Sequence, residues 1–164
     1  MSVLVTPAYA AQARDRLGRD RTLAVEQFAV LETDPQRART IARGPLGFMG
    51  QVPAYQASFR RMDFTQEEID QRTDRLVDAL VAWGDPASIA ARITEQLEAG
   101  ADHVLISLVT DTADAQSVEP WRQLAEHQLV RPPQNTRPER PSRRQRYEYG
   151  TALPRARMRP DRAF

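Results

Sequence analysis

The sequence predicts an α/β fold, and three features along the chain support this prediction. Short apolar runs alternate with segments whose apolar residues recur every three or four positions, as strands alternate with helices. Several helical segments begin with a capping side chain followed by proline, which suits the first helical position. The clearest unit is the helix expected over residues 85–99, followed by the strand expected over residues 103–109.

Both ends of that helix are marked in the sequence. Asp85 is expected to cap it, because its carboxylate accepts hydrogen bonds from the free N–H groups of the first turn. Pro86 follows at a position where no N–H is needed, and Gly100 adopts the left-handed stop at little cost. The helix is expected to bury one face, whose apolar residues are spaced four apart: Ile89, Ile93 and Leu97.

The run from Val104 to Val109 is almost continuously apolar. Strands of a parallel sheet have such runs when helices cover both faces of the sheet. We therefore expect this strand to be buried on both faces.

The first third of the chain shows the same alternation. We expect a short strand at residues 3–5, a helix over residues 6–17, a strand over residues 23–31 and a helix over residues 36–43. The polar pair Glu26 and Gln27 interrupts the apolar run of the second strand. The helix starts are marked by the cap-and-proline pairs Thr6–Pro7 and Asp34–Pro35, and the first helix is expected to stop at Gly18.

The middle of the chain is less regular. A short helix is expected over residues 54–61, with Tyr55 and Phe59 on one face. Glycine and proline are expected to break any long element before and around it. The residues concerned are Gly44, Pro45, Gly47, Gly50 and Pro53.

Residues 65–68 form a capping box, and Phe64 and Ile69 are placed to pack against each other as a hydrophobic staple. The helix that starts here is expected to break near Thr73 and to resume through Trp83. A final helix is expected over residues 117–129, with three residues facing inward: Trp121, Leu124 and Ala125.

Charge and composition divide the chain near Val130. Residues 1–130 hold 13 arginines against 19 acidic residues, whereas residues 131–164 hold 10 arginines against 3 acidic residues and 6 of the 12 prolines. The second segment has few aliphatic residues and is not expected to bury enough apolar surface to offset the entropy of ordering. We therefore expect an α/β domain over residues 1–130 and a disordered Arg- and Pro-rich tail over residues 131–164.

The composition also excludes some classes of site. The chain has no cysteine, which excludes disulfides, thiolate catalysis and cysteine-ligated metal. No apolar run approaches the roughly 20 residues needed to span a membrane. The first residues lack the basic start of a signal peptide. A cytoplasmic protein without membrane contact is expected.

Four segments together resemble a known family. They are residues 4–7 (LVTP), 30–35 (VLETDP), 74–85 (DRLVDALVAWGD) and 99–104 (AGADHV). Over about residues 3–130 the chain resembles the carboxy-terminal part of the luciferase-like flavin or deazaflavin oxidoreductases. The resemblance implies the carboxy-terminal portion of a (β/α)8 TIM barrel, in a family whose actinobacterial members often use the deazaflavin coenzyme F-420.

The resemblance also implies that this barrel is incomplete. A (β/α)8 barrel takes about 250 residues, whereas this chain has 164, and the family's amino-terminal half has no counterpart in it. The intact family transfers a hydride to or from a small-molecule substrate, or activates oxygen as a monooxygenase, with reduced coenzyme F-420 or FMN. Because strands that precede this segment largely hold the cofactor, the truncated chain is expected to bind it poorly and to be inactive.

Candidate site residues follow from where ligands bind in such barrels, which is on the loops after the strands. Those loops contain Glu32 and Thr33 after one strand and Thr110 and Asp111 after another, with Thr112 next to them. These residues are candidates for contact with a cofactor or substrate. The alternative is a structural role, in which Thr33 and Asp34 cap the following helix and Asp111 starts a turn.

Arg60 and Arg61 are candidates for binding an anionic substrate or cofactor tail. A guanidinium donates two parallel hydrogen bonds to phosphate, which suits that role. The segment that contains them, residues 53–64, resembles the family's segment before the last barrel unit. A solvated helix face is the competing interpretation.

Histidine and tryptophan do not point to a site. His103 precedes its strand, so it is expected at the bottom of the barrel, where residues serve stability. His127 is expected on a surface helix, and the two histidines do not form a metal site at recognisable spacing. Trp83 and Trp121 are expected as core anchors. No catalytic residue is assigned, and no metal is expected.

Two other functions stay open. One is a non-catalytic interaction module, because an incomplete parallel sheet leaves edges that can pair with a second copy or with an amino-terminal half-barrel. The other is nucleic-acid binding through the tail, in which Arg143–Arg146 contacts phosphates and Tyr147 or Tyr149 stacks on bases. The acidic body makes nucleic acid the less favoured partner. A solvated tail, or a tail read in the wrong frame of a G+C-rich gene, explains the same composition.

Overall fold

The computed structural model describes residues 2–111 and 118–127. All of them belong to one compact unit, Met1–Arg131. The predicted disordered tail, the last residues of the predicted final helix and the candidate Thr112 lie outside the described residues. Within the described part, no helix is long and apolar enough to cross a membrane.

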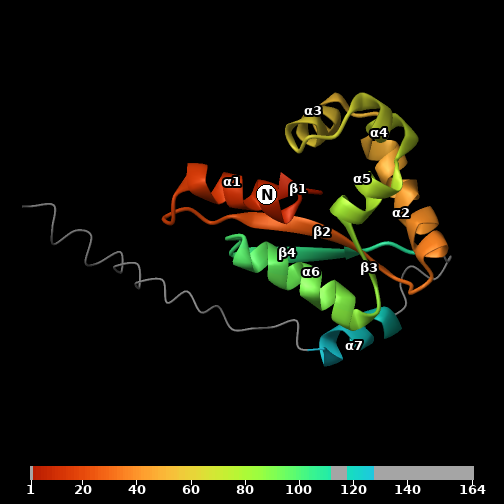
Figure 1. Cartoon of the computed structure of the whole chain (residues 1–164). Coiled ribbons are helices and arrows are strands. Elements are labelled where there is room, and N and C mark those ends of the chain that lie inside the picture. Colours follow the sequence, from red (N-terminus) through yellow and green to blue (C-terminus); the bar gives the residue numbers. More distant parts are fainter. Residues whose placement is uncertain (1, 112–117, 128–164) are drawn as a thin grey trace, which may run out of the picture. The chain divides into compact units, whose positions relative to one another are not determined.

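The described residues form a mixed α/β fold around a small parallel sheet (Figure 1). Its strands are β1 (Ser2–Val3), β2 (Ala24–Leu31), β3 (Val81–Gly84) and β4 (His103–Leu108). This confirms the α/β class. Every strand pair in the sheet includes β2, which is therefore central.

Register places three strands around β2. The stretch of β2 from Ala24 to Ala29 pairs with β4. Val25 and Glu26 also pair with β1, and the last four residues of β2 pair with β3. A residue that pairs with two strands must hold them on opposite edges. Therefore β1 and β3 follow one another along one edge of β2, and β4 occupies the other edge.

The predicted caps of three helices are confirmed. These helices are α1 (Pro7–Leu17), α2 (Pro35–Met49) and α6 (Pro86–Glu98). In each, proline takes the first position and the side chain before it accepts a backbone N–H: Thr6 from Tyr9, Asp34 from Arg37, and Asp85 from Ser88. The predicted stops at Gly18 and Gly100 are also found, with φ of +69° and +104°, conformations that glycine adopts with little strain.

The predicted break after Arg43 is wrong, because α2 continues without interruption to Met49. Pro45 removes one backbone hydrogen bond of the helix, which normally bends or ends it. Ala38, Ala42 and Leu46 lie four residues apart and are all buried. Burial of this continuous apolar stripe stabilises the helix across Pro45, since tertiary packing outweighs local propensity.

Helices α3 (Pro53–Arg61), α4 (Gln66–Gln71) and α5 (Asp74–Leu80) follow. The capping box of α4 is present in full, and a ring contact places Tyr55 and Phe59 on one face of α3. The predicted break near Thr73 is confirmed, because Arg72 adopts a left-handed conformation with φ of +49°. The expected continuation of the helix through Trp83 is wrong, because residues 81–84 form strand β3.

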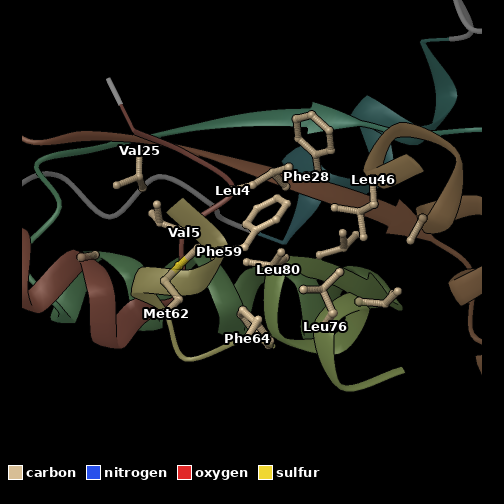
Figure 2. Close-up of a cluster of buried hydrophobic side chains, with 14 of the residues drawn as sticks. Leu4, Val5, Val25, Phe28, Leu46, Phe59, Met62, Phe64, Leu76 and Leu80 are labelled. Atoms are coloured by element: carbon tan, nitrogen blue, oxygen red, sulfur yellow. The ribbon is translucent and has the colours of Figure 1, made fainter. Parts of the chain in front are cut away.

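Neighbouring residues of the strands belong to two separate apolar clusters. Ala29 and Ala82 pack with Ile89 and Ile93 of α6. Phe28, Val30 and Val81 belong to a larger cluster, part of which is shown in Figure 2. Because successive side chains of a strand point to opposite faces, helices cover both faces of the β2–β3 part of the sheet. The helical residues of the larger cluster include Ala38, Ala42 and Leu46 of α2 and Leu76, Val77 and Leu80 of α5.

Helix α1 lies beside α6. The Nε atom of Arg14 donates to the Gly100 carbonyl over 2.8 Å, and its guanidinium forms an ion pair with Asp102 over 2.6 Å. The connections from β1 to β2 and from β3 to β4 therefore run through neighbouring helices.

The prediction that the last strand is buried on both faces is wrong. Among the described strands, β4 pairs only with β2. Ile106 and Leu108 pack toward α6, whereas His103 is exposed and Leu105 is 52% exposed on the other face. Helices α2 and α5 cover that face over β2 and β3, and the described residues leave β4 uncovered there.

The final helix, α7 (Glu119–Glu126), packs on α6 through Leu124, which is buried. The expectation that Trp121 and Ala125 face inward is wrong. Trp121 is 44% exposed and Ala125 is exposed. One buried leucine satisfies the contact with α6, and the short helix turns its other apolar residues to the surface.

Candidate functional site

The carboxyl ends of the parallel strands meet at one edge of the sheet, where ligands bind in α/β proteins. The segments that follow β2, β3 and β4 begin with Glu32, Asp85 and Val109. The structure brings two candidates together at this edge, because Arg37 connects them. Arg37 lies 2.9 Å from a Glu32 carboxylate oxygen and 3.5 Å from an Asp111 carboxylate oxygen.

Sequence reasoning missed Arg37. Asp34 caps α2 and Pro35 takes its first position, so Arg37 lies in the first turn of the helix. Side chains of a helix lean toward its amino terminus, and that direction takes the guanidinium back to the loop after β2. The signal was therefore available in the spacing from the cap.

Capping accounts for part of this edge. Glu32 is half-buried, and its carboxylate accepts the Asp34 N–H over 3.0 Å as well as the Arg37 guanidinium. Asp34 in turn accepts the Arg37 N–H over 2.8 Å. Thr33 and Thr110 are both exposed. The loop after β2 is thus ordered by its own hydrogen bonds, with Asp34 rather than Thr33 as the cap.

The edge is acidic. Glu32, Asp34, Asp85 and Asp111 contribute four carboxylates to these loops, and Arg37 contributes the cation that pairs with two of them. Hydrogen bonds from the Ser88 hydroxyl and N–H hold the pKa of Asp85 below its ordinary value. An anionic ligand would be repelled here, so the described loops suit a neutral or cationic group better than a phosphate.

Arg60 and Arg61 do not belong to this edge. Both are exposed, and the Arg60 guanidinium donates to Gln56 in the preceding turn over 2.9 Å. Their helix α3 lies apart from the loops that follow β2 and β4 (Figure 1). The two arginines therefore lie on the exposed surface of α3, and the structure does not bring them near Glu32 or Asp111.

The two histidines lie in different places. His103 is exposed at the amino end of β4, the end opposite the candidate edge. His127, which follows α7, lies near enough to Asp85 for its charge to contribute to the lowered pKa of that carboxyl. Across residues 2–111 and 118–127 no group of three acidic or histidine side chains is placed to hold a metal ion.

A second polar cluster surrounds Asp78 of α5. The Arg39 guanidinium donates two hydrogen bonds to its carboxylate, over 3.0 and 2.7 Å, and the Trp83 indole N–H donates a third over 2.8 Å. Arg39 also lies 5.4 Å from the centre of the Trp83 ring, within reach of a cation–π interaction. Trp83, which was expected as a core anchor, is half-buried within this cluster.

The Asp78 cluster predicts a loss of stability in acid. Partial burial raises the pKa of Asp78, but hydrogen bonds from Arg39 and Trp83 outweigh it and hold that pKa below its ordinary value. A carboxylate whose pKa is lower in the folded state contributes stability above its unfolded pKa of about 4. That contribution is lost as the pH falls through the lower folded value.

The test compares urea unfolding of the wild type and Asp78→Asn from pH 7 to pH 3. The wild type is expected to be the more stable at pH 7, and the difference is expected to shrink as the pH falls. Asp70→Asn is the control, because Asp70 is exposed and its carboxylate accepts from Gln66 on its own helix. A difference that stays constant down to pH 3 would contradict the role given to the Asp78 carboxylate.

Comparisons with models of protein families, with curated proteins and with solved structures found no match for this chain.

Proposed function

We propose that this chain is the carboxy-terminal part of a luciferase-like oxidoreductase. In the intact enzyme, reduced coenzyme F-420 or FMN would transfer a hydride to a small-molecule substrate or activate oxygen. The proposal assigns cofactor binding mainly to other strands of a barrel, so the 164-residue chain alone is inactive. It also places the chain in the cytoplasm.

The observation that carries the proposal is the order of the sheet. In a (β/α)8 barrel each parallel strand pairs with the next, with a helix on the outside between them. Here β1 pairs with β2 and β2 pairs with β4, all in parallel, and the neighbouring helices α1 and α6 lie in the connections. The proposal treats β3 as a short additional strand before the last barrel strand.

The outer edge of β4 also supports the proposal. Among the described strands, none pairs with the outer edge of β4. On the face away from α6, the Ser107 hydroxyl donates to the Glu26 carboxylate over 2.7 Å, and Leu105 is half-exposed nearby in register. The free outer edge of β4 suits a barrel that further strands complete, whereas the cover that α2 and α5 give to this face of β2 and β3 departs from a barrel interior, which holds no helices.

The acidic candidate edge agrees with the proposal that other strands of the barrel bind most of the cofactor. FMN carries a phosphate, and the loops at Glu32, Asp85 and Asp111 offer it carboxylates. Those loops are assigned to the reacting ring or the substrate, and the phosphate is assigned to other strands.

Titration of the purified full chain with FMN and with coenzyme F-420 tests this assignment. We expect no stoichiometric binding at micromolar concentration, measured by cofactor fluorescence and by calorimetry. Tight one-to-one binding of either cofactor would contradict the statement that other strands are needed. The control is Glu32→Gln with Asp111→Asn, which removes two carboxylates from the edge and tests whether charge repulsion alone prevents binding.

The free edge of β4 also favours a second candidate, a non-catalytic module that pairs with another copy through that edge. Edge strands with exposed apolar side chains are prone to such pairing. Light scattering of the full chain distinguishes the two candidates. A stable dimer that Leu105→Lys dissociates would support the second candidate, and a monomer at high concentration would reject it.

A further inference from the structure

Glu26 of β2 carries a half-buried carboxylate that forms no ion pair in the part of the chain that the structure describes. A charge taken partly out of water is costly unless an opposite charge pairs with it. The other half-buried carboxylates of this part each form an ion pair with an arginine: Glu32, Glu68, Asp78 and Asp102. Glu26 is therefore the exception, and its charge is available to a ligand.

The carboxylate of Glu26 can accept further hydrogen bonds. One of its oxygens accepts from the Ser107 hydroxyl over 2.7 Å. The second oxygen has no partner within the described residues, and it does not belong to their buried unpaired atoms, so it contacts solvent. The Ser107 oxygen, which gives its proton to Glu26, keeps lone pairs that can accept from a donor. Glu26 and Ser107 thus offer neighbouring acceptors on one face of the sheet.

Apolar side chains flank Glu26 on this face. Register places Val3 of β1 on one side of it and Leu105 of β4 on the other. Side chains in register on neighbouring strands point to the same face, and the strands are about 4.8 Å apart, so this row spans about 10 Å. Leu105 is 52% exposed. A ligand that reaches the carboxylate therefore also contacts an exposed apolar side chain.

The site has no cation of its own within the described residues. His103 lies on the same face, two residues before Leu105, but it is exposed and no ion pair joins it to Glu26. The arginine of the candidate edge is distant, because it pairs with Glu32, six residues further along the chain. At about 3.3 Å per residue of strand, that separation is about 20 Å.

From these observations we propose that this face of the sheet binds a small organic guanidinium compound with a short apolar chain. The guanidinium pairs with Glu26 and donates to Ser107, because its planar fork matches two neighbouring acceptors. The apolar chain covers Leu105. The site is independent of the proposed oxidoreductase function, because it uses neither a flavin cofactor nor the acidic candidate edge.

The test is a titration of the full ¹⁵N-labelled chain with n-butylguanidinium at constant ionic strength, followed through backbone amide signals. We expect the signals of Glu26 and Leu105 to shift and saturate with a dissociation constant on the order of 1 mM. The signal of Thr33, at the candidate edge, is expected to stay in place. Unmoved signals of Glu26 and Leu105 would overturn the proposal, and movement of Thr33 alone would place the cation at the acidic edge instead.

Matched probes test the ligand class. n-Butylurea has nearly the same shape without the charge, and it is expected to bind at least about tenfold more weakly, which corresponds to about 1.4 kcal/mol. n-Butylammonium keeps the charge without the planar fork, and methylguanidinium keeps the fork without the apolar chain. Each of these two is expected to bind at least about threefold more weakly than n-butylguanidinium. Equal or tighter binding of any of the three would refute the stated ligand chemistry.

A matched pair of variants tests the location. Glu26→Gln removes the charge at nearly constant shape and is expected to weaken n-butylguanidinium binding at least about tenfold. Glu98→Gln makes the same change at an exposed position of α6, the helix on the other face of the sheet, and is expected to leave binding unchanged. Equal binding by the two variants would place the cation elsewhere and overturn the proposal.

Urea unfolding of Glu26→Gln separates binding from a purely structural role. Glutamine keeps an acceptor for the Ser107 hydroxyl and removes a half-buried charge without an ionic partner. The unfolding midpoint is therefore expected to be no lower than that of the wild type, with Glu98→Gln as the control. A clearly lower midpoint for Glu26→Gln alone would assign the carboxylate to the stability of the fold and overturn the proposal.

Discussion

Replacement of Phe59 by alanine is expected to lower the free energy of unfolding by about 3–5 kcal/mol. The Phe59 side chain is 0% exposed and belongs to the larger apolar cluster (Figure 2). It packs there with Leu4, Val5 and Met62, so its removal leaves a cavity where α3 meets the segment after β1. Since small domains are stable by only about 5–15 kcal/mol, this loss is a large part of the total.

Phe48→Ala is the matched control for this prediction. It makes the same chemical change at a side chain that is 73% exposed on α2, and it is expected to change stability by less than about 0.5 kcal/mol. Both variants are measured by urea unfolding followed by circular dichroism. Similar effects of the two would mean that Phe59 is not buried as described.

Replacement of Gln27 by leucine is expected to cost about 1–3 kcal/mol although it adds apolar character to the core. Gln27 is buried on the α6 side of β2, and its amide nitrogen donates to the Leu80 carbonyl over 2.9 Å. Its oxygen accepts from the amide nitrogen of Gln96 over 3.1 Å, and Gln96 also donates to the Val5 carbonyl over 2.7 Å.

The cost arises because leucine leaves buried polar groups without partners. The Leu80 carbonyl, at the junction of α5 and β3, loses the donor supplied by Gln27, and Gln96 loses an acceptor. Among the buried side-chain atoms of the described part, the Gln96 oxygen already has no partner, so the network has no spare group to compensate.

Urea unfolding of Gln27→Leu, with Gln12→Leu on the exposed face of α1 as control, measures this effect. The control is expected to change stability by less than about 0.5 kcal/mol. The double variant with Gln96→Leu completes a mutant cycle that isolates the glutamine pair. A Gln27→Leu protein at least as stable as the wild type would show that the amide network does not hold β2, β3 and α6 together.

The sequence predicted the features that depend on a few neighbouring residues. The caps at Thr6, Asp34 and Asp85 follow from side chains that reach their own helix, so local chemistry determines them. The same holds for the stops at Gly18 and Gly100.

Features that depend on distant contacts were not predicted. Helix α2 passes through Pro45 because Leu46 is buried by residues from elsewhere in the chain. Residues 81–84 become a strand because β2 offers an edge for pairing, and their helical pattern does not reveal that edge. Strand β4 is buried on a single face because helices reach only that face. The apolar run in the sequence does not show which helices cover the strand.

The candidate edge was predicted in part. The order of strand and loop identified Glu32 and Asp111, because loops after parallel strands gather at one edge. The spacing of Arg37 from the Asp34 cap indicates its contact with Glu32, whereas its contact with Asp111, in the loop after β4, depends on the folded arrangement.

The most direct test of the central claim is to sequence the encoding locus upstream of the Met1 codon and across the codons near Val130. Our account predicts an upstream frame that encodes further strand–helix units, and a joined protein that binds coenzyme F-420 or FMN. A locus in which no upstream frame encodes such units would contradict the claim that this fold is part of a larger oxidoreductase barrel.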